Sequence, residues 1–241
     1  MSVLQQLLLS GGKADPMWSN VVFLLGNDNL PNGTSSFVDQ SSSAKSITRN
    51  GSSVVYSNAQ APSGMTTSLY FNGGTNYLYT SDHDDWSVNG DMTWEAMVYH
   101  TSFPAYPTYV GHFPDVSGSN GAWWVLGPRI GSDNNFYFEY TTNGSTPQYV
   151  NVSTAITANV WYHVAYVKTG TSIKFYVNGT QIGTTQTIAN STLYNSTASM
   201  CIGGGSGGGS YNLNGYMSNI RITKAARYTA NFTPPTLPLP S

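Results

Sequence analysis

The acidic loop at residues 82–85 holds the side chains best suited to binding a metal ion. Its sequence, Asp-His-Asp-Asp, places Asp82, Asp84 and Asp85 within four positions. Ca²⁺ takes six to eight oxygen ligands, and loop carbonyls can supply several of them beside carboxylates. Asp28, in the loop expected after the first strand, is a second weak candidate. We expect no cofactor other than this candidate Ca²⁺, and a solvated acidic turn is the alternative interpretation.

The residues that could support hydrolysis are few. The chain has two glutamates, Glu95 and Glu139, and neither has another acid two or three positions away. Glycoside hydrolysis uses two carboxylates roughly 5–10 Å apart. A Ser/His/Asp triad would need one of the chain's four histidines, which are His83, His100, His112 and His163. No G-x-S-x-G motif, however, lies in the strand–turn–helix setting that such a nucleophile requires. We therefore expect no enzymatic activity.

Aromatic residues are the strongest remaining signal for binding. The chain has 17 Tyr and 6 Trp, and several lie in expected loops. In the Trp-Trp pair at 123–124, adjacent side chains face opposite sides of a strand, so one should point outward. Exposed rings among Asn, Ser and Thr can stack on sugars or form a wet protein interface, and both options stay open. The candidate ligand-binding residues are Tyr106, Tyr109, Trp123, Trp124 and Tyr211.

The elements that must position these side chains are strands, and the clearest lie between residues 160 and 183. Trp161–Lys168 is rich in aromatic and β-branched residues, and Ile173–Val177 alternates apolar with polar side chains. Asn178-Gly179 suits a type I′ turn, whose two central residues both need a positive φ. Thr180–Thr185 then returns as the partner strand. This stretch predicts a three-stranded meander.

Ten further short runs have the composition of strands, and no long helix is indicated. Charged residues make up 8% of the chain, whereas exposed helix surfaces rely on Lys, Glu and Arg. A dozen short strands with turns between them predict a sandwich or jelly roll. The further runs are 21–25, 54–56, 68–71, 77–79, 92–99, 122–126, 135–140, 148–152, 200–202 and 216–223.

Composition also excludes several classes of function. The net charge of −2 provides neither the basic surface that nucleic acid requires nor a cationic face for lipid. No apolar run approaches the ~20 residues that span a bilayer, and the first nine residues do not form a signal peptide. We expect synthesis in the cytoplasm. The single cysteine, Cys201, is expected to be a small buried apolar residue.

The two ends differ from the body of the chain. Residues 1–14 are expected to form a short docking arm detached by Gly11-Gly12, and the apolar residues on one side of it are Val3, Leu4, Leu7 and Leu8. Residues 15–233 are expected to form one domain. The proline-rich tail, 234–241, should be extended, on the surface or on a neighbour, because proline donates no ladder hydrogen bond.

Several of these stretches carry a resemblance to a known family. Residues 161–165 (W-Y-H-V-A), 174–179 (K-F-Y-V-N-G) and Ile182-Gly183 resemble the central hairpins of concanavalin A-like, laminin-G-type jelly-roll domains. Residues 15–25 and 215–235 resemble the opening strand, closing strand and tail of such domains in tailed-phage virion proteins. The resemblance covers roughly residues 15–236. It implies an all-β jelly-roll β-sandwich with a short N-terminal arm.

The resemblance also implies a function. It suggests a virion surface protein, either a head decoration or fibre subunit or a tail-fibre component, that is a homo-oligomer in contact with other virion proteins and adheres weakly to host-surface glycans. A secreted carbohydrate-binding module is the alternative, and a glycoside hydrolase is a weaker one. Many relatives hold Ca²⁺ with an aspartate after the first strand and another in the closing strand. This chain has Asp28, but its closing motif carries Ser218-Asn219 without the acid, so we expect the fold not to depend on metal.

Overall fold

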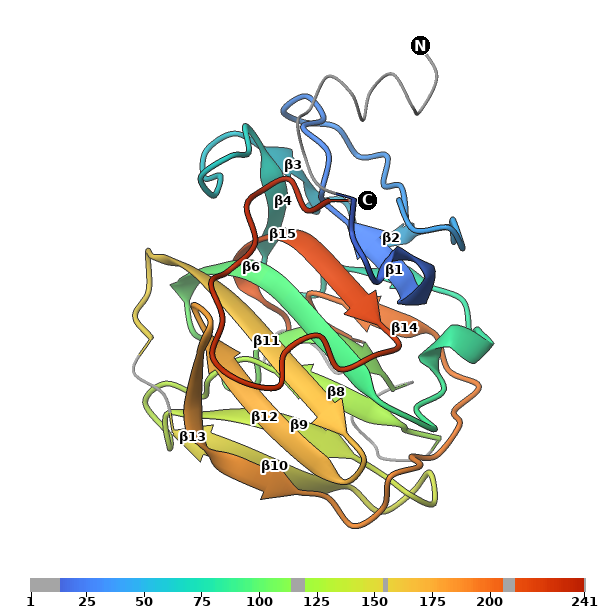
Figure 1. Ribbon diagram of the computed structural model, residues 1–241. Helices are drawn as coiled ribbons and strands as arrows, with labels where there is room; N and C mark the ends of the chain where they lie inside the picture. Colours follow the sequence, from blue (N-terminus) through green and yellow to red (C-terminus); the bar gives the residue numbers. More distant parts are fainter. Residues whose placement is uncertain (1–13, 114–119, 154–155, 206–210, 241) are drawn as a thin grey trace.

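The computed structural model describes residues 14–113, 120–153, 156–205 and 211–240. Within these ranges two antiparallel sheets pack face to face (Figure 1), and helix is limited to two 3₁₀ turns, η1 (Trp18–Asn20) and η2 (Asp84–Trp86). No helix in the described part of the chain has the length and apolar character needed to cross a bilayer. The prediction of an all-β sandwich is confirmed. The expected arm, with Val3, Leu4, Leu7 and Leu8, lies outside the described residues.

The eight-stranded sheet contains the meander and the closing strand. Its strands follow one another in the order β13 (Thr180–Thr187), β12 (Ser172–Val177), β11 (Trp161–Thr169), β6 (Met92–Ser102), β15 (Asn214–Thr223), β4 (Ser68–Asn72) and β3 (Val55–Ser57), with β1 (Val21–Leu25) also paired to β15. The seven-stranded sheet runs β10 (Gln148–Ser153), β9 (Asn135–Tyr140), β8 (Trp123–Leu126), β7 (Thr108–His112), β14 (Met200–Ile202), β5 (Tyr77–Thr80) and β2 (Thr48–Asn50).

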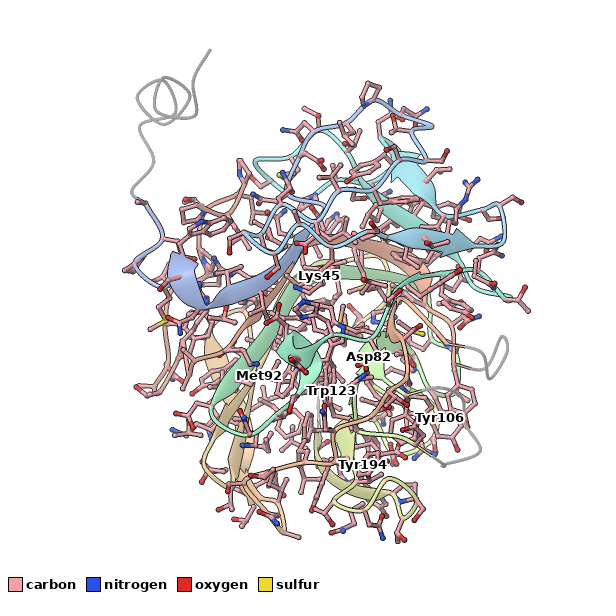
Figure 2. The ribbon with its side chains drawn as sticks, turned by 90° about the vertical axis from the view of Figure 1, so that its right-hand side faces the viewer. Lys45, Asp82, Met92, Tyr106, Trp123 and Tyr194 are labelled. Carbon is pink, nitrogen blue, oxygen red and sulfur yellow. The ribbon has the colours of Figure 1, made fainter. Side chains whose placement is uncertain are left out.

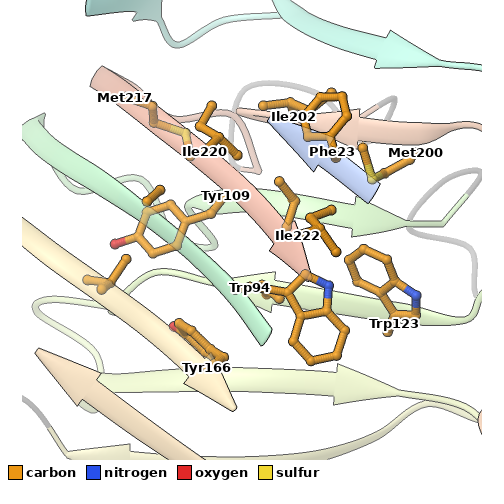
Figure 3. Packing of buried hydrophobic residues seen from close by; sticks show 14 of the residues in the cluster. Phe23, Trp94, Tyr109, Trp123, Tyr166, Met200, Ile202, Met217, Ile220 and Ile222 are labelled. Atoms are coloured by element: carbon orange, nitrogen blue, oxygen red, sulfur yellow. The ribbon is translucent and has the colours of Figure 1, made fainter. Parts of the chain in front are cut away.

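The hydrophobic core fills the space between the sheets. Because side chains alternate across a strand, every second residue of each sheet points into it. Trp94 of β6 lies at its centre, with its ring centroid 5.1 Å from that of Trp123 and 5.2 Å from that of Phe138 (Figure 3). All three side chains are almost fully buried. The two faces that point away from this core are therefore the surfaces available for binding.

The Asn178-Gly179 turn has the predicted conformation. The φ angles of Asn178 and Gly179 are 48° and 78°, both in the left-handed region, and the turn joins β12 to β13. Two other strands were not predicted. These are β2 and β7. All five positions of β7 are buried, and its sequence, Thr-Tyr-Val-Gly-His, shows no apolar–polar alternation that would indicate a strand.

Residues 224–240, here called the C-terminal strap, cross the outer face of the eight-stranded sheet (Figure 1). Tyr228 and Phe232 stack on each other and pack against a buried patch of that face that includes Tyr176. The Phe232 N–H donates to the carbonyl of Gly179 at 2.8 Å, and Leu239 is buried against β1. The proline-rich tail therefore packs on its own domain, and its terminal turn contributes to the domain's buried surface.

A buried carboxylate lies beneath the strap. One oxygen of Glu95, on the outer face of β6, accepts from Arg221 Nε at 2.8 Å; the other lies 3.0 Å from His163 Nε2 and accepts from the Tyr228 hydroxyl at 2.8 Å. Burial alone would raise the pKa of Glu95. The positive charges of Arg221 and its neighbours outweigh burial and lower this pKa to about 2. Glu95 is therefore a buried anion that joins the strap to the sheet.

The same network reaches the beginning of the domain. Arg221 Nη1 donates to Asp15 at 3.0 Å, and Arg227 Nη1 of the strap donates to the other oxygen of Asp15 at 3.2 Å. Asp15 and Arg227 are 212 residues apart in the sequence. The opening and closing segments are thus held together by charge.

Candidate functional site

Two of the five aromatic candidates point into the core. Tyr109 is 2% exposed and its hydroxyl lies 2.9 Å from His100 Nε2 (Figure 3). Trp123 is fully buried, and its Nε1 donates to the carbonyl of Trp86 at 2.9 Å. The expectation that these rings line a surface site is wrong for both. For Tyr109 the cause is a register shift between Thr108 and Val110, which turns both Tyr109 and Val110 toward the core.

The other three candidates meet on the outer face of the seven-stranded sheet. The ring centroids of Tyr106 and Tyr211 are 4.8 Å apart in a stacked arrangement, and that of Tyr211 is 5.6 Å from Trp124. In Figure 2 Trp123 lies between the sheets, while Tyr106 lies at the side of the seven-stranded sheet. Trp124 does point outward, as the alternation predicts, but Phe113 and Tyr211 cover it and leave it 5% exposed. We call Phe113, Trp124, Tyr211 and Tyr106 the aromatic row.

A cation extends the aromatic row. The guanidinium of Arg129 lies 4.5 Å from the ring centre of Tyr106 and 5.0 Å from that of Tyr137. Its Nη1 is also 3.5 Å from Asp133. Arg129 is therefore already held by two rings and a carboxylate, at distances at which cation–π attraction is significant.

An open pocket of about 340 Å³ adjoins the aromatic row on the same face. Tyr77 and Tyr79 of β5 stand half-buried on one side of it, since Leu78 between them points into the core. Its volume lies in the range of small-ligand sites. Phe113 belongs to both the pocket and the aromatic row, so the two are continuous. The pocket is lined by Asn50, Tyr77, Tyr79, Phe113, Ser199 and Cys201.

The described residues of the pocket lining are uncharged, and three of them carry hydroxyl groups. No hydrogen bond between described residues uses the hydroxyls of Tyr77, Tyr79 or Ser199. Burial raises the pKa of the Cys201 thiol to about 12, so this side chain is a neutral part of the pocket floor, as the sequence predicted. Aromatic faces beside neutral donors and acceptors suit the apolar and polar sides of a sugar ring.

Sequence reasoning missed most of this pocket. The Tyr-Leu-Tyr pattern at 77–79 was recognised as a strand, and its alternation already places both tyrosines on the face opposite Leu78. What the sequence did not reveal is that β2, β5 and β14 are neighbours in one sheet, which brings Asn50 and Cys201 to the same pocket.

The weak Ca²⁺ candidates are engaged in local contacts. Asp28 accepts from the Tyr56 hydroxyl at 2.6 Å, and Asp82 lies 3.3 Å from His112 Nε2. Asp85 pairs with Lys45 at 2.6 Å; burial opposes ionisation, but hydrogen bonds from Lys45 and Ser43 hold its pKa below the usual range. Asp84 begins η2. Among the described residues, no three His, Cys, Asp or Glu side chains form a group that could hold a metal ion.

The two glutamates lie on opposite sides of the sandwich. Glu95 is buried under the strap on the outer face of the eight-stranded sheet, while Glu139 lies on the outer face of the seven-stranded one, beside Trp124 in register. A hydrolytic pair must flank one glycosidic bond. Glu95 and Glu139 are separated by the core and cannot form that pair.

The two antiparallel sheets, packed face to face, form a jelly-roll β-sandwich. The family model described as "Concanavalin A-like lectin/glucanases superfamily", of laminin G type, matches residues 72–231. The chain belongs to this superfamily. A comparison of the sequence with curated proteins finds no match.

Solved structures share the fold. The binding domain of Paraclostridial Mosquitocidal Protein 1 superposes with a TM-score of 0.66 at 14% identity, covering 88% of this chain and 50% of that one. A botulinum neurotoxin type C structure, described as concerned with cell entry through two ganglioside molecules, gives 0.62 at 15% identity, with 88% and 49% covered. The botulinum neurotoxin serotype D ligand-binding domain, in complex with N-acetylneuraminic acid, gives 0.61 at 13%, with 88% and 49% covered. The chain spans about half the length of these structures.

Proposed function

We propose that this chain is a non-enzymatic, lectin-like module that binds glycans on the outer face of its seven-stranded sheet. The observation that carries this proposal is the uncharged pocket in which Tyr77 and Tyr79 stand beside Asn50 and Ser199. The apolar face of a sugar ring would stack on a tyrosine, and its hydroxyls would exchange hydrogen bonds with Asn50, Ser199 and the tyrosine hydroxyls. Structural neighbours whose descriptions name sialic acid and gangliosides give independent support for carbohydrate as the ligand class.

Replacing a pocket tyrosine should abolish most of the binding. Tyr79→Ala and Tyr77→Ala are each expected to weaken glycan affinity about 5- to 100-fold, because burying and stacking one ring is worth about 1–3 kcal/mol. A glycan array would identify ligands for the wild-type protein, and calorimetry would compare the variants.

The matched control for this experiment is Tyr70→Ala. Tyr70 is also half-buried on a strand, but it lies on the outer face of the other sheet, so its loss should leave affinity unchanged. Binding should also persist in a chelator, since none of the described residues that line the pocket carries a carboxylate. Equal affinities of the wild type and both pocket variants for every array ligand would refute the proposal.

We further propose that the module works at the surface of a tailed-phage particle, made in the host cytoplasm, as a head decoration, fibre or tail-fibre component. The resemblance of residues 15–25 and 215–235 to the opening and closing segments of virion domains supports this setting. Its partners would be other virion proteins, further copies of itself and host-surface glycans. A secreted carbohydrate-binding module remains the alternative.

The arm is the proposed anchor to the particle. Deleting residues 1–12 should leave a folded β domain that no longer joins particles, because four large apolar side chains would each contribute about 1.5–3 kcal/mol on burial against a partner. Circular dichroism and quantification of the protein on purified particles would check both parts. Leu7→Asp with Leu8→Asp should reproduce the loss without shortening the chain. Incorporation of the truncated protein at wild-type occupancy would exclude the arm and leave the proline-rich tail as the next candidate.

A further inference from the structure

Six strands of the seven-stranded sheet present outward-facing residues at one level. The register pairs Tyr79 with Cys201, Cys201 with Gly111, Gly111 with Trp124, and Trp124 with Glu139. Tyr149, 62% exposed, continues the same line on β10. Neighbouring strands are about 4.8 Å apart, so Tyr79 and Glu139, four strands apart, are separated by roughly 19 Å. A binding surface therefore runs perpendicular to the strands, from the pocket to Glu139.

Gly111, at the middle of this line, has no side chain to rise above the sheet. A side chain at Gly111 would place its Cβ 1.8 Å from Cδ1 of Trp124, so the indole can lie down across β7 only because Gly111 has no side chain. Phe113 packs on the same indole, with ring centroids 4.5 Å apart. Tyr211 covers this indole, so among the described residues Tyr211 provides the aromatic surface between the pocket and Glu139.

Glu139 ends the line with a carboxylate that accepts no hydrogen bond from the described residues. None of the hydrogen bonds or ion pairs among the described residues reaches its carboxylate, although the side chain is half-buried. Burial raises the pKa of Glu139 to about 7, and the charge of Arg129 opposes this only in part. A half-buried carboxylate without partners is costly, and a ligand that supplies hydroxyl donors would relieve that cost.

The charges around this line favour a neutral ligand. Among the described residues, Arg129 is the cation that influences the pKa of Glu139, and it is already held by Asp133 and two tyrosine rings. The described residues that line the pocket carry no charge. An anionic sugar would meet an unpaired carboxylate at one end of the line and no free cation in the pocket at the other, so like-charge repulsion would oppose it.

We propose that the ligand is an uncharged oligosaccharide that lies across the strands from Tyr79 to Glu139, and that Glu139 is the specificity-determining acceptor for hydroxyls of a sugar distant from the pocket. This inference rests on the proposed glycan-binding function and deepens it. It separates this chain from the structural neighbour that was solved with N-acetylneuraminic acid. It also predicts that a single sugar, which fills only the pocket, binds more weakly than a longer chain.

The test uses the full chain and defined probes. N-acetylglucosamine oligomers and maltodextrins, each of one to six units, provide neutral length series, and lactose with 3′-sialyllactose provides a pair that differs by one charge. In at least one neutral series, affinity should rise at least tenfold between one and four units and then level off. The sialic acid should give no gain over lactose.

The acceptor role is tested by Glu139→Gln and pH. The substitution keeps the side-chain shape but removes the charge, so it should weaken oligosaccharide binding about tenfold at pH 8 and much less at pH 6. Wild-type affinity should rise with pH through about 7, as Glu139 becomes ionised, and this rise should be absent from the variant. Among the described residues, the groups facing Glu139 are Arg129 and Tyr211, with Trp124 and Tyr149 on its two neighbouring strands. Burial raises the pKa of Tyr211, so this hydroxyl stays protonated through the tested range.

The outcomes separate the two proposals. If the wild type binds glycans but a single sugar binds as tightly as a hexamer, or if Glu139→Gln leaves affinity at pH 8 unchanged, the inference is overturned and the glycan-binding function stands. Preference for 3′-sialyllactose would overturn it too. If the wild type binds no glycan in the array or in these series, both proposals fail together. Unchanged thermal unfolding of Glu139→Gln would confirm that a loss of binding is not a loss of fold.

Discussion

Glu95→Ala is expected to lower the free energy of unfolding by about 3–5 kcal/mol, one of the two largest effects that we predict for a single substitution. Removing one partner of a buried ion pair leaves the other charge uncompensated, and costs of this size follow. Here Arg221 and Arg227 would both lose Glu95, and among the described residues Asp15 would be the one carboxylate left to pair with both of them. Chemical denaturation monitored by tryptophan fluorescence would measure the loss.

The matched control is Glu139→Ala. It removes the chain's other glutamate from a half-buried position without ion pairs among the described residues, so it should cost less than 1 kcal/mol or even stabilise the fold. A similar loss for both variants would contradict the role assigned to the Glu95 network.

The same carboxylate makes stability depend on acid. The pKa of Glu95 falls from its ordinary 4.5 to about 2, since Arg221, His163 and Arg227 outweigh the effect of burial. Because the pKa of Glu95 is lowered in the folded state, its ionised carboxylate contributes fully to the free energy of unfolding above pH 4.5. This contribution is lost as pH falls toward 2. Linkage puts this contribution at about 3 kcal/mol. The wild type should therefore lose stability over this interval, and the Glu95→Ala variant should lose correspondingly less.

Gly179→Ala is the second substitution that we expect to lower the free energy of unfolding strongly. A Cβ at this position would lie 1.9 Å from the carbonyl oxygen of Phe232, which cannot move without displacing the strap, and the φ of +78° adds the cost of a left-handed residue. The left-handed conformation alone costs about 1–2 kcal/mol. We expect a total loss of about 3–4 kcal/mol once the stacked strap contacts are disturbed.

Gly170→Ala is the control for backbone conformation. Gly170 lies in the other turn of the meander with a φ of +56°, and nothing lies within 4 Å of the Cβ that it would gain. Its substitution should cost only the 1–2 kcal/mol of the left-handed residue. The difference between the two variants in equilibrium unfolding measures the strap clash, and equal losses would show that the strap does not constrain this turn.

Local patterns were enough to predict the fold class. Period-2 alternation and the Asn178-Gly179 pair identified the meander, because both depend on neighbouring residues only. β7 was missed because a strand buried on both faces shows no alternation of apolar and polar residues. The prolines that precede it, at 104 and 107, also suggested a loop. The register shift that turns Tyr109 inward has no sequence signal that we recognise.

The sequence predicted only part of the candidate site, because the site joins segments that lie far apart in the chain. Tyr106, Trp124 and Tyr211 come from three separate segments, and the structure brings them together as stacked rings. The pocket beside them depends on β5 lying next to β14 and β2, which is a property of the sheet order rather than of any segment. The Glu95 network is still less local, since it joins residues up to 212 positions apart.

The salt bridge between Asp15 and Arg227 has a geometric consequence for how the module is displayed. Both ends of the described chain are fastened to one side, the outer face of the eight-stranded sheet, where the Leu239 N–H also donates to the side-chain oxygen of Asn27 at 2.6 Å. The pocket opens on the other side. A support that holds this module through either end would therefore leave the proposed glycan-binding surface facing away from the support. Many copies mounted in this way would all face one direction, so modest single-site affinities would combine into strong attachment to a glycan-coated surface.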